Sequence, residues 1–237
     1  MQASSIWQKE LLENCANKKS LVIKLLFPLL LGGPLILSSA PLQAKAGVVS
    51  LLVVFIGVFG SGVGLSKDRT DGVLRRIVAT PLSPRRIIME QVLVNSAIEL
   101  AQVSPVLALL VLQRDPTWWL LSLAMTLLAS ILVANVVGVL VASIATSAGQ
   151  VHLYSALIVF PLLALSGVFM PVSSANLAQK LIAQLLPFSY FQQSLMAVLG
   201  ETSYQALSET ALYSSIAVLA FLSLAYLAAS RLLRMEE

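Results

Sequence analysis

Long apolar runs separated by short polar segments constrain this chain more than any other feature. Six of these runs approach the span of about 20 residues that crosses the hydrocarbon core of a bilayer. Of the 237 residues, 58% are hydrophobic and only 11% are charged, whereas a soluble domain carries roughly 25% charged residues. The sequence therefore predicts an all-α integral membrane protein, with residues 1–237 forming one domain and no room for a soluble catalytic domain.

The predicted spans and the segments between them account for the whole chain. The six transmembrane helices are expected at residues 21–39, 47–65, 87–112, 118–144, 151–170 and 207–227. Residues 1–20 are polar with apolar positions at helical spacing, which predicts an amphipathic interfacial helix. Residues 171–204 are too polar for a span and too apolar for a solvated loop. Because Pro187 interrupts their helical pattern, we expect two short re-entrant helices in the outer leaflet.

Basic residues give the predicted orientation. One side, which holds both termini and residues 66–86, carries twelve of the fifteen Lys and Arg residues; the other side carries Lys45, Arg114 and Lys180. This bias predicts that both termini are cytoplasmic in a multi-pass protein of the plasma (inner) membrane. The net charge of +4 is thus explained by the basic residues that orient the chain in the membrane, and no nucleic-acid partner is expected.

Residues 66–86 form a charged island that holds six of the fifteen basic residues. A short helix is predicted to start at Asp71 and to end at the Thr80-Pro81-Leu82-Ser83-Pro84 turn. Its apolar positions at 73, 74, 77 and 78 share one face, while Arg75 and Arg76 point toward lipid phosphate or a partner. The alternative is an ordinary loop that only fixes topology, but a passive loop does not need an exit stiffened by prolines.

The island also resembles a known family. The order DRTDGVLRRIVATPLSPRRIIMEQ is similar to the coupling segment of type-2 ABC exporter permeases. The matching residues are Arg69, Gly72, Leu74, Thr80, Pro81, Leu82, Ser83, Ile87 and Ile88. The chain departs from the family pattern at Thr70, Val73, Arg75 and Glu90-Gln91. Leu165-Ser166-Gly167-Val168-Phe169-Met170-Pro171 resembles the family's LSGxxxP signature, and residues 186–191 resemble its NPLTY-like segment, so the resemblance covers nearly the whole chain.

The resemblance implies a function and a set of site residues. The chain would be the permease subunit of an ATP-driven exporter, paired with a second copy or a similar permease and coupled to cytoplasmic ABC ATPase subunits. ATP and Mg would be bound by that partner, and no cofactor by this chain. Residues implied in coupling to the ATPase are Arg69, Asp71, Gly72, Leu74, Arg75, Arg76, Ile77, Thr80 and Pro81. Those implied at an outer gate are Ser166, Gly167, Pro171 and Pro187.

Span three carries a polar face made of Asn95, Glu99 and Gln102. An ionisable group at that depth is costly unless it is paired or faces water. One interpretation is that this face lines the translocation path or the contact between permeases. The other is a polar clasp between helices, which is also the interpretation for Asn135 in span four.

Other motifs receive structural interpretations. No GxxxxGK[ST] phosphate loop occurs, so the ATPase is expected to be another chain. As a transporter subunit, this chain is not expected to be an enzyme. The Gly60-xxx-Gly64 pair predicts close helix packing. His152 is expected to be a surface residue, because a metal site would need further ligands. Ser166-Gly167 superficially resembles an intramembrane protease motif, but His152 is predicted near the opposite membrane face.

Two alternative functions remain open at this point. A membrane anchor or assembly subunit of an ABC-type ATPase complex would couple through the same island without moving a solute. An independent secondary transporter is disfavoured by the short chain and by the lack of a visible internal repeat.

Few charges lie inside the spans, which favours an apolar or amphiphilic substrate such as a lipid, drug or peptide.

Overall fold

The computed structural model describes residues 18–73, 84–112, 119–169 and 176–199. Every regular element in these ranges is a helix, which confirms the all-α prediction. The helices are α2 (Lys18–Leu37), α3 (Leu42–Thr70), α5 (Pro84–Val111), α6 (Trp119–Ile144), α7 (Ala148–Leu165), α8 (Leu177–Leu185) and α9 (Pro187–Leu199). The interfacial helix predicted at residues 1–20 and the span predicted at residues 207–227 lie outside the described ranges.

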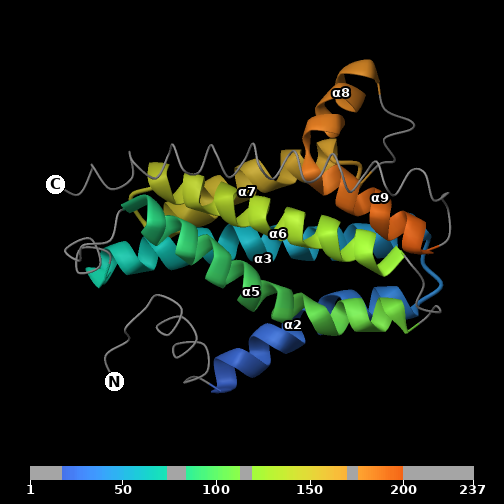
Figure 1. Ribbon diagram of the computed structural model, residues 1–237, viewed down its shortest axis with the longest axis horizontal. Coiled ribbons are helices and arrows are strands. Elements are labelled where there is room, and N and C mark those ends of the chain that lie inside the picture. Colours follow the sequence, from blue (N-terminus) through green and yellow to red (C-terminus); the bar gives the residue numbers. More distant parts are fainter. Residues whose placement is uncertain (1–17, 74–83, 113–118, 170–175, 200–237) are drawn as a thin grey trace.

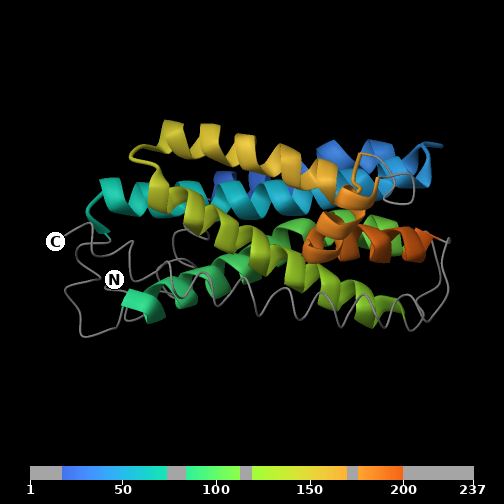
Figure 2. The same cartoon turned by 90° about the horizontal axis from the view of Figure 1, so that it is seen from above.

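Four of the described helices, α3, α5, α6 and α7, are long and apolar enough to cross a membrane. The apolar segment of α2, Val22–Leu37, is shorter, so the six-span layout stays a prediction. The long helices run along the long axis of the molecule, and α8 projects sideways from them (Figure 1). Seen from above, α3 lies between α7 on one side and α5 and α6 on the other (Figure 2). It contacts α2, α5, α6, α7 and α9 and is the central helix.

The proline inside α5 is accommodated locally. Pro105 lies within α5 and has no N–H to donate to the carbonyl of Ala101 one turn earlier. The hydroxyl of Ser104 donates to that carbonyl instead, at 2.8 Å. Substitution of a side-chain donor for the missing backbone donor is what allows proline inside a helix surrounded by lipid.

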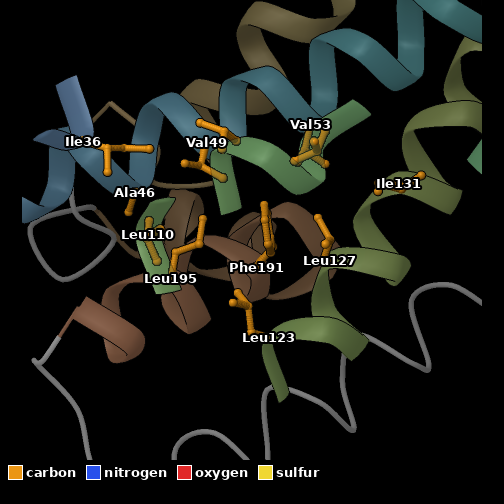
Figure 3. Packing of buried hydrophobic residues seen from close by; sticks show 12 residues of the cluster. Ile36, Ala46, Val49, Val53, Leu110, Leu123, Leu127, Ile131, Phe191 and Leu195 are labelled. Atoms are coloured by element: carbon orange, nitrogen blue, oxygen red, sulfur yellow. The ribbon is translucent and has the colours of Figure 1, made fainter. Parts of the chain in front are cut away.

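The core at the Leu42 end of α3 is built around α9. Phe191 and Leu195 are fully buried and lie among apolar residues of α3 and α6 that include Val49, Val53 and Leu127 (Figure 3). In contrast, α8 leaves Leu177 74% exposed and Leu185 72% exposed. The predicted division of residues 171–204 into two short helices is confirmed, although the second begins at Pro187 itself. Their depth in the membrane stays a prediction.

Helices α3 and α6 cross with their backbones close together. A Cβ added to Gly57 would lie 2.5 Å from the Cβ of Ala134, and Gly138 faces Ser61 Oγ and Val58 O with no room for a side chain. Such close approach of small residues is typical of helix packing in membranes. The predicted Gly60–Gly64 packing pair is confirmed only at Gly60, where an added Cβ would lie 2.9 Å from Glu99 Oε1 in α5. At Gly64, no described residue lies within 4 Å of an added Cβ.

Candidate functional site

The predicted coupling residues that the structure describes lie at the Thr70 end of α3. This helix runs through the membrane span and into the island, to Thr70. Asp71 caps it, and Gly72 has a φ of 67°, a left-handed conformation that glycine adopts at the ends of helices. The helix predicted from Asp71 therefore does not start at Asp71 or Gly72, and the described range ends at Val73.

The rest of the predicted coupling set lies beyond the described ranges. These residues are Leu74, Arg75, Arg76, Ile77, Thr80 and Pro81. Their roles stay predictions.

Arg69 links the end of α3 to the end of α6. Its guanidinium Nη1 donates to the carbonyl oxygen of Ala145 at 3.0 Å, one residue past the end of α6. A positive charge at a helix C-terminus is favourable because the unpaired carbonyls there carry partial negative charge. Arg69 thus binds the short connection between α6 and α7, a contact that sequence spacing did not indicate.

That connection is itself held by reciprocal capping. The side chain of Ser147 accepts a hydrogen bond from the Gln150 N–H at 3.3 Å, and Gln150 Oε1 accepts from the Thr146 N–H at 2.9 Å. The first of these bonds satisfies a backbone donor in the first turn of α7, and the second satisfies the N–H of the residue before the cap. The carbonyl that Arg69 binds therefore belongs to an ordered turn.

A cluster of buried polar side chains lies between α3, α5 and α6 inside the bundle. The amide of Asn135 is fully buried, and its Nδ2 donates to Glu99 Oε2 at 2.5 Å, Ser96 Oγ at 3.3 Å and Ile131 O at 3.0 Å. Glu99 is only 5% exposed. On its other side it meets Gly60, where an added Cβ would lie 2.9 Å from Oε1.

These contacts match the polar clasp that was one of two interpretations of span three. Gln102 is buried and Asn95 is half-buried on the same face of α5. The structure brings Glu99 and Asn135 together. A role for Asn95, Glu99 and Gln102 in the translocation path or at a permease contact stays a prediction.

The predicted outer-gate residues Ser166 and Gly167 form the turn that ends α7. Ser166 caps the helix, and Gly167 has a φ of 82°. The Val168 N–H donates back to the Leu163 carbonyl at 3.3 Å, which is the pattern of a glycine-terminated helix end. Pro187 begins α9, and Pro171 lies outside the described ranges.

Gln43, which sequence reasoning did not single out, holds this turn from α3. Its Nε2 donates to the Gly167 carbonyl at 2.5 Å and to the Val168 carbonyl at 3.3 Å. One turn further along α3, a Cβ on Gly47 would lie 3.0 Å from the Val168 carbonyl oxygen. Nothing in the sequence marks Gln43, since a polar residue at the start of a span is common.

Neither a metal site nor a serine–histidine pair is formed by the described residues. Across these ranges, no three His, Cys, Asp or Glu side chains gather at one place. His152 lies at the first turns of α7 and Ser166 at its other end, so the two side chains do not meet. His152 is exposed, as predicted, and packs beside the ring of Phe59 with 5.6 Å between ring centroids.

Comparison with known families identifies the family of the chain. A family model described as ABC-2 type transporter matches residues 1–199, which include every described helix. The chain belongs to the ABC-2 type transporter family. The resemblance seen in the sequence is confirmed: the chain is a multi-pass membrane permease subunit of an ABC transporter, a domain without an ATPase of its own, and the family works with an ABC ATPase. The comparison with curated proteins gave no match.

Proposed function

We propose that this permease is the membrane subunit of an ATP-driven exporter of an apolar or amphiphilic substrate, such as a lipid, drug or peptide. The contact between Arg69 and Ala145 carries the proposal. It places a charged residue of the coupling segment on the connection between two membrane helices. A force applied to the segment by an ATPase would therefore reach α6 and α7 directly.

The same proposal includes the partners and the orientation. The permease would work as a homodimer or beside a similar permease, with both termini and residues 66–86 on the cytoplasmic side. ATP and Mg would be bound by the separate ATPase. The apolar character of the cargo is supported by α6, which carries no charged residue between Trp119 and Ile144.

The decisive experiment uses the coupling segment. The permease and its co-purifying ATPase are reconstituted in vesicles, and ATP hydrolysis is measured together with ATP-dependent movement of a fluorescent phospholipid analogue and of a hydrophobic cationic dye. The double variant Leu74→Asp/Ile77→Asp places charges on the predicted apolar face. We expect hydrolysis to continue without movement of either probe, while membrane insertion is unchanged.

Ala79→Asp is the matched control, because helical spacing places position 79 away from the apolar face. It should transport as the wild type does. Transport that survives in the double variant would overturn the coupling role of the segment. Hydrolysis without movement of any solute in the wild type would instead favour an anchoring subunit. A Glu99→Gln variant with unchanged transport and hydrolysis would remove Glu99 from the translocation path.

A further inference from the structure

The two ends of α3 make the same kind of contact. At one end, Gln43 donates to the carbonyls of Gly167 and Val168, which follow the last turn of α7. At the other end, Arg69 donates to the carbonyl of Ala145, which follows the last turn of α6. Each is a side-chain donor from α3 bound to the C-terminal end of a neighbouring helix, where carbonyls lack partners within the helix.

The helix between these contacts is suited to transmit force. Gln43 and Arg69 are 26 residues apart in one unbroken helix, which corresponds to about 39 Å at about 1.5 Å per residue. Prolines lie inside α2, α5 and α7, but α3 contains none. Prolines are a main cause of sharp kinks in helices. Gly57 and Gly62 in its middle are packed against α6 and α7.

The turn that Gln43 holds also reaches the second outer helix. Val168 is 4% exposed and belongs to the same buried cluster as Phe188, the second residue of α9. The packing therefore links Gln43, through the turn at Gly167 and Val168, to Phe188 near the start of α9. Of the predicted outer-gate residues, Ser166 and Gly167 form this turn and Pro187 begins α9.

We infer that Gln43 is a positioning residue for the outer gate, and that α3 is a strut that carries displacement of the coupling segment to the Gly167–Val168 turn. The transport side of this inference rests on the proposed function, whereas the positioning role of Gln43 does not. Gln43 acts through the two carbonyls and does not itself need to touch a substrate.

Hydrogen exchange in the Gly167–Val168 turn tests the positioning role in the purified full-length permease. Gln43→Glu keeps the shape of the side chain but replaces its N–H donor with an oxygen, and Gln43→Ala removes the group. Both should raise amide exchange in a peptide covering residues 163–169 by roughly three- to tenfold, as expected for losing one or two hydrogen bonds. Gln193→Glu is the matched control, since Gln193 is exposed on α9, and should leave exchange unchanged.

A peptide from the middle of α6 should exchange at the wild-type rate in every variant, which shows that the bundle is folded. Wild-type exchange at residues 163–169 in both Gln43 variants would overturn the positioning role. If Gln43→Ala disturbs the whole bundle, exchange in the near-isosteric Gln43→Glu variant decides whether Gln43 positions the turn.

The strut is tested in the complex with the co-purifying ATPase, trapped by ATP and vanadate. Trapping should change exchange at residues 163–169 in the wild type. In Gln43→Glu this response should be lost, although ATP hydrolysis continues. A response in the coupling segment without any response at the turn would overturn the strut and leave the proposed function intact. If the wild type shows neither transport nor any ATP-dependent change in exchange, the proposed function is refuted, and the strut is refuted with it. The positioning role of Gln43 is still decided by amide exchange at residues 163–169 without ATP.

Discussion

Replacing Gly57 with alanine tests whether the α3–α6 crossing sets the stability of the bundle. The added Cβ would lie 2.5 Å from the Cβ of Ala134, whereas carbon atoms pack at about 3.5 to 4.0 Å. The alanine methyl group has no rotamer by which it could move aside, so the helices must separate by about 1 Å. Overpacking of this kind costs about 1 to 3 kcal/mol.

The net effect follows from two opposing contributions. The separation also loosens the buried valines around the crossing, among them Val54, Val58, Val133 and Val137, which places the cost near the upper end of that range. Alanine regains about 0.5 to 1 kcal/mol over glycine in a helix. We therefore expect a loss of about 2 kcal/mol, or a Tm lower by about 4 to 8 °C for a chain of this size.

Thermal unfolding of the purified permease in one detergent, followed by tryptophan fluorescence, measures this effect. Gly64→Ala is the matched control on the same helix, because nothing lies within 4 Å of an added Cβ there; its Tm should stay the same or rise. The swap Gly57→Ala/Ala134→Gly moves the methyl group across the interface. Its Tm should return to that of Ala134→Gly alone, because the next atoms lie 3.5 Å away. Equal Tm values for Gly57→Ala and Gly64→Ala would refute the steric argument.

Two further predictions concern polar contacts. Asn135→Ala removes the donor to Glu99 and should lower the free energy of unfolding by about 1 kcal/mol, the scale of polar contacts between membrane helices. A double-mutant cycle with Glu99→Ala should give a coupling energy of similar size. Simple additivity of the two changes would contradict the clasp. Ser147→Ala removes the cap of α7 and should cost about 1 kcal/mol, seen as a lower Tm, whereas Ser147→Asp keeps an acceptor and should unfold as the wild type does. A Ser147→Asp variant as unstable as Ser147→Ala would show that capping is not the cause.

The positions of the described helices could be predicted from the sequence because lipid requires long apolar runs. Predicted spans at residues 87–112 and 118–144 agree closely with α5 and α6. The span predicted at residues 151–170 begins and ends earlier, as α7, because Ser147 caps its start and Gly167 adopts a positive φ at its end. The capping serine and the glycine are both visible in the sequence, but a prediction from hydropathy alone does not use them.

The faces of the helices could not be predicted in the same way. A helix that is apolar on all sides has no periodic pattern to show which residues meet which neighbour. For this reason the sequence singled out Gly60 and Gly64, although it is Gly57 that meets Ala134 of α6. Gly60 instead gives room to Glu99 of α5. The same absence of pattern hid Gln43 and the contact of Arg69, since both depend on which helix ends lie beside α3.

The contacts along α3 favour tilting over sliding as its mode of movement. Neighbouring helices in lipid gain little from hydrophobic burial, so close packing and hydrogen bonds fix their relative positions. Axial sliding of α3 by one turn, about 5.4 Å, would bring side chains of other residues into the space that Gly57 leaves for Ala134. It would also break the hydrogen bonds that Gln43 and Arg69 donate to carbonyls of α7 and α6. A tilt about the Gly57 crossing would keep the steric fit there and would move the two ends of α3 in opposite directions. In that case, a displacement at Arg69 would produce an opposite displacement at the turn that Gln43 holds.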